Sequence, residues 1–400
     1  MDGKILYTLG SEEELLLYER TNPDDLKERI RKIKEKYGSR LLILGHLYER
    51  DEIIEMSDLR GDSFQLSASA AKSDCEIIVF CGVHFMAETA DILANRPDLL
   101  KKRQGRRVDV ILPDPTAGCA MANMATLSEV EDCWKQLSGL LDISTVIPVT
   151  YVNSTAELKA FCGRNGGIAC TSTNARSVLE WSFSKGKRVL FFPDQHLGRN
   201  TALQMGIPES EQILWNHSNP ALLEELRILN EPAPIMKTPF LGGNTKEEIL
   251  GSRIILWNGF CPVHQHFTNH AVNRVRKEYP NGKILVHPEC KQSVVHAADG
   301  AGSTSMILNE IAAGGADKEW IVGTEYHLVH RAMKEYPDRI IHNLSDKPEI
   351  CPTMDKITLP KLCWALECLD RNKPVPVVRV PDAVSEDALV CLERMLACKS

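Results

Sequence analysis

Residues 108–123, VDVILPDPTAGCAMAN, place a cysteine directly beyond a strand pattern. The apolar run 108–112 predicts a buried strand, and Pro113 ends it. The chain then turns through Gly118 to Cys119. Because glycine has no Cβ atom, the backbone of such a turn can approach a ligand closely. The stretch therefore predicts a thiol at the rim of a sheet, within reach of a ligand.

Apolar runs of the same kind alternate with helical patterns along most of the chain. Further strands are predicted at residues 76–80, 146–152, 188–192, 253–256, 283–286 and 320–322. Helices are predicted at residues 128–137, 155–162, 175–184 and 269–278. Near-continuous Ile, Val and Leu strands that alternate with helices indicate parallel sheets covered on both faces. Ligands of such folds bind beyond the carboxyl ends of the strands.

Three segments repeat four motifs in the same order, which indicates an internal repeat. A strand-end triplet comes first, and its copies are His46-Leu47-Tyr48, Tyr151-Val152-Asn153 and His287-Pro288-Glu289. A hydroxyl turn then precedes a helix, at residues 61–63, 171–173 and 302–305. A later strand leads to a helix-start histidine, which is His84, His196 or His327. A cysteine turn ends each segment, with Cys119, Cys261 or Cys351.

The repeat predicts an α/β fold of three similar αβα sandwich domains with parallel sheets. The predicted domains are residues 39–125, 126–265 and 266–352, each with one cysteine turn. A helical segment, 1–38, precedes them. The segment 353–400, with predicted helices at 359–369 and 386–397, is expected to pack across them. The polar stretch 216–252 is predicted to be an insertion in the second domain.

The composition is typical of a globular protein without a nucleic-acid or membrane partner. The 400 residues carry a formal net charge of −7, and 43% of them are hydrophobic. Acidic residues stand where a signal peptide has its apolar core, and no apolar run reaches the roughly 18 residues of a membrane span. The 13 cysteines are odd in number and include no CxxC pair, which indicates reduced thiols. We therefore expect a cytoplasmic protein.

The three cysteine turns together predict a metal cluster. A single free cysteine is most often a small buried hydrophobic residue, and most of the other cysteines are interpreted in this way. One cysteine at the same place in each of three domains gives a three-thiolate site if the domains face one another. Three thiolates leave one iron of a [4Fe–4S] cluster without a protein ligand, and such an iron is a Lewis acid that binds substrate oxygens.

Histidines close to Cys261 offer an alternative metal site. His264, His266 and His270 could bind zinc, but neither a matching carboxylate nor an HExxH motif accompanies them. His264, three residues after Cys261, is better placed to face the cluster and to hydrogen-bond a substrate.

The strand-end triplets and hydroxyl turns supply the remaining candidate residues. The triplets carry two Tyr, two His, one Asn and one Glu, which can bind carboxylates and move protons. Glu289 is a candidate general base, or else a cap of the strand end. Ser303 and Thr304 precede a helix, where hydroxyls and backbone N–H groups suit a phosphate or a carboxylate, and plain N-capping is the alternative.

Longer motifs resemble the quinolinate synthase family. They include FCGVHFMAETA at residues 80–90, PDPTAGCAMA at 113–122, PDQHLGRN at 193–200, WNGFCPVH at 257–264 and AADGAGSTS at 297–305. The resemblance extends from about residue 44 to 362 and so covers most of the chain. It implies three pseudo-threefold-related αβα domains around a central cavity.

The resemblance also implies an activity, a cofactor and a set of site residues. The family condenses iminoaspartate with dihydroxyacetone phosphate to quinolinate, for NAD biosynthesis, with loss of phosphate and water. Cys119, Cys261 and Cys351 resemble the ligands of a [4Fe–4S] cluster with one open iron. The residues that resemble the catalytic set are Tyr48, Glu289 and His264, and those that resemble the substrate-binding set are His46, Ser63, Tyr151, Asn153, Ser172, His287, Ser303 and Thr304. The resemblance further implies functional coupling to L-aspartate oxidase, which produces iminoaspartate.

Two rival functions stay open at this level. Another cluster-dependent hydro-lyase on the same architecture would need the same three cysteines, so only a substrate assay separates it. An iron–sulfur sensor or electron-transfer module would need a fully ligated cluster and few convergent polar groups. The strand-end triplets and the hydroxyl turns count against this second rival.

Overall fold

The computed structural model describes residues 12–217 and 241–398, which form two compact units. Among these residues, unit 1 comprises 12–119, 325–338 and 348–381. Unit 2 comprises 120–217, 241–324, 339–347 and 382–398. Each unit is therefore built from segments that are separate in the sequence. The predicted domain boundaries at 39–125, 126–265 and 266–352 stay a prediction.

Unit 1 contains one five-stranded sheet, in the order β14-β4-β3-β1-β2. Its strands are β1 (Leu41–His46), β2 (Leu59–Gly61), β3 (Ile77–Cys81), β4 (Asp109–Ile111) and β14 (Val377–Val378). All pairs are parallel except that of β14 with β4. Every residue of β3, IIVFC, is buried, as expected for a parallel strand covered on both faces.

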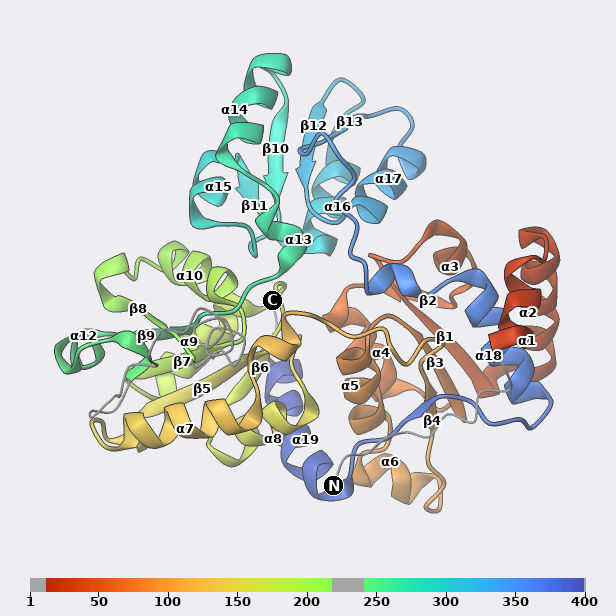
Figure 1. The fold of residues 1–400 in the computed structure, drawn as a ribbon, viewed down its shortest axis with the longest axis horizontal. Coiled ribbons are helices and arrows are strands. Elements are labelled where there is room, and N and C mark those ends of the chain that lie inside the picture. The colour runs from red at the N-terminus through yellow and green to blue at the C-terminus, as the bar shows by residue number, and fades with distance from the viewer. Residues whose placement is uncertain (1–11, 218–240, 399–400) are drawn as a thin grey trace, which may run out of the picture. The chain divides into compact units, whose positions relative to one another are not determined.

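Helices cover both faces of this sheet. The helices of unit 1 are α1 (Glu12–Glu19), α2 (Pro23–Tyr37), α3 (Asp51–Met56), α4 (Ser63–Lys72), α5 (His84–Ala94), α6 (Pro97–Lys102), α17 (Tyr326–Glu335) and α18 (Leu359–Asp370), with short 3-10 turns at Gly38–Arg40 and Met354–Lys356. Figure 1 shows α4 and α5 on one side of the sheet and α2 and α18 on the other. The Asn22 side chain caps α2 by accepting the Asp24 N–H at 2.8 Å, and Gly38 ends the helix with a φ of 54°.

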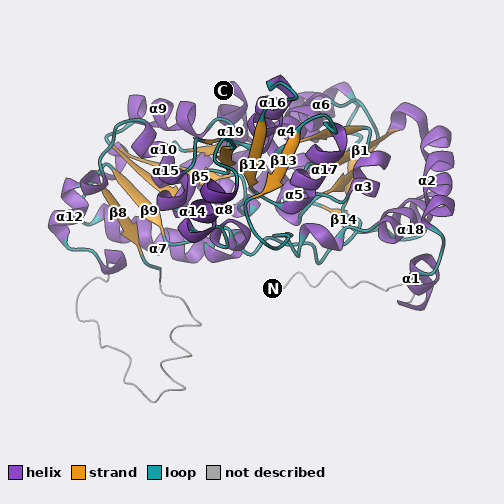
Figure 2. Cartoon of the chain, turned by 90° about the horizontal axis from the view of Figure 1, so that it is seen from above, coloured by secondary structure: helices purple, strands orange, loops and turns teal. Residues whose placement is uncertain are grey.

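The first sheet of unit 2 has the order β6-β5-β7-β9-β8 and is parallel throughout. Its strands are β5 (Val146–Tyr151), β6 (Ile168–Cys170), β7 (Arg188–Phe192), β8 (Gln212–Trp215) and β9 (Ile254–Trp257). Its helices are α7 (Leu127–Ser138), α8 (Ala156–Arg164), α9 (Ala175–Lys185), α10 (Gln195–Gln204), α12 (Lys246–Gly251) and α19 (Asp382–Ala397), with 3-10 turns at Ala122–Met124, Ile143–Thr145, Glu209–Glu211 and Leu241–Gly243. Figure 2 shows α9 and α10 on one side of the strands and α7 on the other.

The second sheet of unit 2 has the order β11-β10-β12-β13 and is also parallel. Its strands are β10 (Lys283–Val286), β11 (Gly300–Ala301), β12 (Glu319–Gly323) and β13 (Ile340–Asn343). The helices beside it are α13 (Pro262–Gln265), α14 (Asn269–Glu278), α15 (Gln292–Ala297) and α16 (Thr304–Ala313). Figure 1 shows α14 and α15 on one side of β10 and α16 on the other.

The three sheets share one strand order. In each sheet, the strand that leads to the strand-end triplet has a neighbour on both sides. One neighbour is the strand that leads to the hydroxyl turn, and the other is the strand that leads to the helix-start histidine. The strand before the cysteine turn comes next, which gives β2-β1-β3-β4, β6-β5-β7-β9 and β11-β10-β12-β13. This common order confirms the predicted α/β class with three parallel sheets flanked by helices.

The strand β8 is a fifth strand, added to the common order of four. The sequence ILWN occurs at the end of β8 and again at the end of its neighbour β9. The copies at residues 213–216 and 255–258 pair in register, so that Trp215 lies opposite Trp257. Asn258 Nδ2 donates to Asn216 Oδ1 at 2.7 Å, just beyond the paired strands. The predicted insertion begins here, but its residues 218–240 lie outside the described residues.

Element ends differ from the predictions by a few residues. The last helix, α19, begins at Asp382 rather than at residue 386. It packs against α8 in unit 2, whereas α18 packs against α2 in unit 1. Within residues 12–217 and 241–398, none of the helices has both the length and the apolar composition needed to cross a membrane.

Candidate functional site

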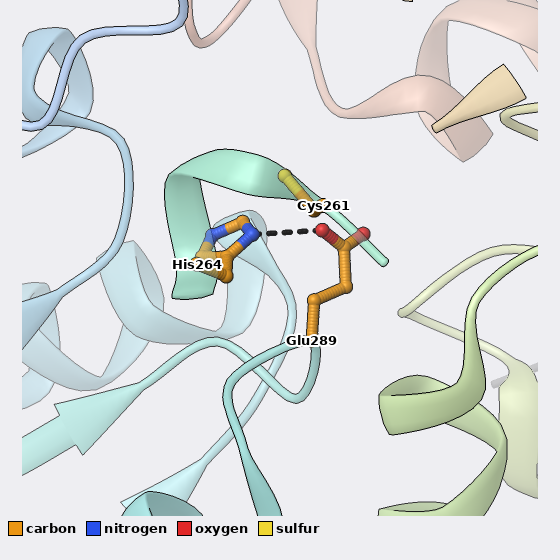
Figure 3. Close-up of side chains that lie close together, drawn as sticks. All are labelled: Cys261, His264 and Glu289. Carbon is orange, nitrogen blue, oxygen red and sulfur yellow. Dashed lines mark hydrogen bonds and ion pairs between the residues drawn. The ribbon is translucent and has the colours of Figure 1, made fainter. Parts of the chain in front are cut away.

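Cys261, His264 and Glu289 each bring one metal-ligating atom within 4.8 Å of the other two. Figure 3 shows these side chains pointing toward one another. Cys261 is the N-cap of α13, so His264 follows it on the same short helix. Glu289 ends the strand-end triplet that follows β10. A thiol, an imidazole and a carboxylate of unit 2 thus meet beyond the carboxyl ends of β9 and β10.

Both ring nitrogens of His264 have hydrogen-bond partners. Nδ1 donates to Glu289 Oε2 at 2.7 Å, because a carboxylate can only accept. Nε2 lies 3.1 Å from the Thr324 hydroxyl oxygen. The ring also stacks on His287, with ring centroids 4.5 Å apart. These contacts fix the orientation of the imidazole.

Two histidines keep Glu289 ionised. Its burial alone would raise the pKa, but the charges of His287 and His264 and hydrogen bonds from His264 and Tyr151 lower the pKa of Glu289 below its usual range. Only 3% of Glu289 is exposed. A buried carboxylate that stays ionised can accept a proton or bind a metal ion at neutral pH.

The strand-end triplets of the two sheets of unit 2 meet at Glu289. Tyr151, at the end of β5, hydrogen-bonds this carboxylate from the other sheet. Asn153, two residues further on, has a buried Oδ1 without a hydrogen-bond partner among the described residues. A buried acceptor of this kind is expected to bind a donor of a ligand. The structure therefore brings predicted site residues of two repeats together.

The two hydroxyl turns of unit 2 differ in their local hydrogen bonds. Ser303 and Thr304 are buried, and Ser303 Oγ accepts the Met306 N–H at 3.3 Å, so N-capping is real at this turn. At the other turn, the local hydrogen bonds are made by Thr171 and Asn174 rather than by Ser172.

The first repeat, in unit 1, brings His46, Tyr48 and Ser63 together. His46 Nδ1 accepts the Tyr48 N–H at 3.1 Å, and the two rings meet edge to face with centroids 5.0 Å apart. His46 Nε2 lies 3.5 Å from Ser63 Oγ. Asp62, not Ser63, caps α4, so the serine hydroxyl is not needed for capping.

The cysteine turns of Cys119 and Cys351, both in unit 1, are linked by two lysines. Lys356 Nζ donates to the Thr116 carbonyl oxygen at 2.9 Å. Lys361 Nζ donates to Asp114 Oδ2 at 2.6 Å and to the Lys356 carbonyl oxygen at 3.0 Å. The chain that follows Cys351 therefore holds the loop that precedes Cys119.

Two buried carboxylates hold cysteine turns, and neither belongs to the predicted site residues. Glu325 accepts the N–H groups of Cys351 at 3.2 Å and of His327 at 2.8 Å. The Asp194 carboxyl accepts the Leu197 N–H at 2.6 Å and also hydrogen-bonds the backbone of Cys261. Burial, and after it the charge of Glu289, raise the pKa of Asp194 above its usual range. Both acids stand two residues before a helix-start histidine, and this shared place in the repeat is the signal that could have found them.

The three predicted ligand cysteines differ in exposure from most of the others. Cys119, Cys261 and Cys351 are partly exposed, and so is Cys398, whereas the remaining cysteines are buried. A thiol that binds a group outside the core needs such exposure. Together with the group around His264, these thiols are compatible with a metal cofactor. Among the described residues, His266 and His270 are not part of that group, so the zinc alternative gains no support.

The fold and the site together define an α/β protein with a candidate metal-binding site at its strand ends. A family model described as "Quinolinate synthetase A protein" matches residues 28–397. The quinolinate synthase of Rhodopirellula baltica is 54% identical over 375 residues, which cover 94% of this chain and 91% of that protein. The quinolinate synthase of Bacillus subtilis is 43% identical over 383 residues, which cover 95% of both chains. The chain therefore belongs to the quinolinate synthase family.

Proposed function

We propose that this protein condenses iminoaspartate with dihydroxyacetone phosphate to give quinolinate, with loss of phosphate and water. The meeting of Tyr151, His264 and Glu289 at the strand ends supports the proposal, because a condensation followed by dehydration needs positioned proton donors and acceptors. The proposal includes a role in NAD biosynthesis, a cytoplasmic location and functional coupling to L-aspartate oxidase.

Cys119, Cys261 and Cys351 would hold a [4Fe–4S] cluster. Their partial exposure supports this assignment, since thiols buried in the core have no room for a bound cluster. The backbone contacts of Glu325 and Asp194 orient two of these turns. When bound, the cluster supplies an iron without a protein ligand, which is a Lewis acid for substrate oxygens.

The residues of the chain would bind the substrates through carboxylate and phosphate groups. Ser303 and Thr304, at the start of the ten-residue helix α16, suit the phosphate, because helix N–H groups and hydroxyls face an anion there. Asn153 Oδ1, buried and without a partner among the described residues, suits a substrate N–H or O–H donor. His46, Ser63, Ser172 and His287 would complete the binding set.

Proton transfer would use Glu289 and Tyr48. Glu289 is buried and ionised, so it can accept a substrate proton, and the His264 Nδ1–H that donates to its Oε2 fixes the orientation of the carboxylate. Tyr48 carries a phenol beside His46, and we assign it to acid–base transfer in the first repeat.

An anaerobic assay for quinolinate from the two substrates tests this function. The wild-type protein, purified without oxygen, is expected to be brown and active, and to lose activity in air. Cys119→Ala should lose the colour, the bound iron and the activity. Cys398→Ala is the matched control, because Cys398 is also partly exposed but is not assigned as a ligand. An iron-free and fully active wild-type protein would contradict the proposed cofactor.

A further inference from the structure

A cavity in unit 2 is lined by residues outside the proposed site. It has a volume of about 430 Å³ and is lined by His196, Arg199, Lys291, Gln292, Ser293 and His296. These residues come from α10 and from α15 with its N-cap Lys291, and the two helices pack against each other. We call this space the basic cavity. None of its lining residues belongs to the proposed substrate-binding or catalytic set.

The positive charge in the basic cavity is not balanced by the protein. Arg199 and Lys291 line it, and no carboxylate does. Within the described parts of the chain, neither of these two side chains has an ion pair. Glu209 acts on Arg199 through its charge without forming an ion pair, and its Oε1 already accepts Gln292 Nε2 at 2.6 Å. Glu289 acts in the same way on His196. Two unbalanced cations beside a cavity favour an anionic ligand.

His196 gives a second, independent observation. Its Nδ1 is buried and has no hydrogen-bond partner among residues 12–217 and 241–398. Burial, followed by the charges of Arg199 and Lys291, lowers the pKa of His196 to about 4. The side chain of Gln265 hydrogen-bonds the same imidazole. A ring nitrogen that is buried without a protein partner is expected to bind a group that the protein does not supply.

We propose that the basic cavity binds a small phosphate-bearing anion. The guanidinium fork of Arg199 matches two phosphate oxygens, and Lys291 supplies a second charge. His196, Ser293 and His296 offer hydrogen bonds around them. The volume exceeds that of inorganic phosphate alone, which favours a phosphate ester over the free ion.

Binding at this cavity would act on the loop that carries His287 and Glu289. Asn200, next to Arg199, donates to the carbonyl oxygens of Pro288 at 2.8 Å and of Cys290 at 2.9 Å. Lys291 directly follows this loop. An anion that binds both Arg199 and Lys291 would therefore stabilise the packing of this loop against α10. The inference does not rest on the proposed reaction, because it concerns only binding to these side chains.

Histidine-ring NMR of the cluster-loaded protein tests the inference, with inorganic phosphate and glycerol 3-phosphate as probes. The His196 signal, assigned by its loss in His196→Gln, is expected to shift saturably with either probe. Following this one signal separates the basic cavity from phosphate binding at Ser303 and Thr304. The Arg199→Gln/Lys291→Gln double variant should bind glycerol 3-phosphate at least about tenfold more weakly.

One control and one further test variant complete the experiment. Lys135→Gln removes one exposed positive charge on α7 in the same unit and should change the affinity less than about twofold. Lys291→Gln alone, an exposed site that is safe for folding, should weaken binding by about threefold. The absence of a saturable His196 shift, or an unchanged affinity in the double variant, would overturn the proposal. Equal binding of succinate would overturn the assignment to phosphate.

Discussion

The cysteine turns of Cys351 and Cys119 stand at the same place in the repeat, yet different contacts hold them. The Cys351 N–H donates to Glu325, a fully buried carboxylate two residues before the helix-start histidine. In the first repeat the matching residue is Gly82, which has no side chain. The loop before Cys119 is held instead by Lys356 and Lys361.

The Cys351 turn is held from within its own repeat, whereas the loop of Cys119 is held from far along the chain. The contacts to the loop of Cys119 join residues 240 and 247 positions apart, whereas Glu325 and Cys351 are 26 apart. Closing a longer loop costs more chain entropy. The contact of Lys356 with the loop is also exposed, whereas the Glu325 contact is partly buried. We therefore expect the Cys119 turn to be the more easily displaced of the two.

Removal of the buried carboxylate should have the largest effect. Glu325→Ala leaves the N–H groups of Cys351 and His327 without their acceptor, and also frees His327 Nδ1, which lies 3.0 Å from Glu325 Oε1. We expect the free energy of unfolding to fall by about 3 kcal/mol, because buried donors lose a charged partner. Chemical denaturation measures this change, and iron analysis of the same variant tests the proposed cofactor.

The matched control for this variant is Glu180→Ala. Glu180 pairs with Arg176 at an exposed site, where the side chains are 54% and 60% exposed, so a change below about 0.5 kcal/mol is expected. If Glu325→Ala costs no more than this control, the turn of Cys351 is not held by the carboxylate.

Loss of Lys361 should have an intermediate effect that depends on pH. Burial raises the pKa of Asp114, but the hydrogen bonds from Lys361 and Thr116 outweigh it and hold this pKa below its usual value. The pair therefore stabilises the fold above the pKa of an unfolded Asp, about 3.9, and this stabilisation is lost as the pH falls through the lower folded pKa. Lys361→Met should cost about 1 kcal/mol at pH 7 and nothing at the acid end of a denaturation series.

An exposed pair in the same unit gives the comparison. Lys102 and Asp74 are 61% and 64% exposed, so Lys102→Met should change the unfolding free energy by less than about 0.5 kcal/mol. A cost for Lys361→Met that does not vary with pH would show that packing of the lysine stem, rather than its charge, holds the loop of Cys119.

The sequence predicts the repeated parts of this molecule well. Strand patterns such as 108–112 are local, and the same four motifs recur three times, so the class and the three parallel sheets follow from them. Tyr151 and Glu289 are both named from strand-end patterns of parallel sheets, and they lie in contact in the folded chain.

The remaining contacts could not be predicted, because local patterns do not encode them. Glu325 and Asp194 look like ordinary helix caps in the sequence, and only the folded chain adds the cysteine N–H to their partners. Thr324 beside His264 has no motif at all. Lys361 reaches Asp114 across 247 residues, a separation that periodicity cannot report.

The smallest effect on stability is expected at Gly118, the glycine before Cys119. A Cβ atom there would meet nothing within 4 Å, so Gly118→Ala should change the unfolding free energy by less than about 0.5 kcal/mol. In the turn of Cys261, a Cβ on Gly259 would lie 2.4 Å from the Pro193 carbonyl oxygen, so Gly259→Ala should cost about 2 kcal/mol. Iron analysis of wild type and Gly118→Ala, both expected to be stable, then tests whether the space beside Gly118 is needed for a bound group. Less iron at unchanged stability would mean that the bound group needs the space beside Cys119, whereas equal iron would contradict the interpretation that a ligand approaches the backbone of this turn.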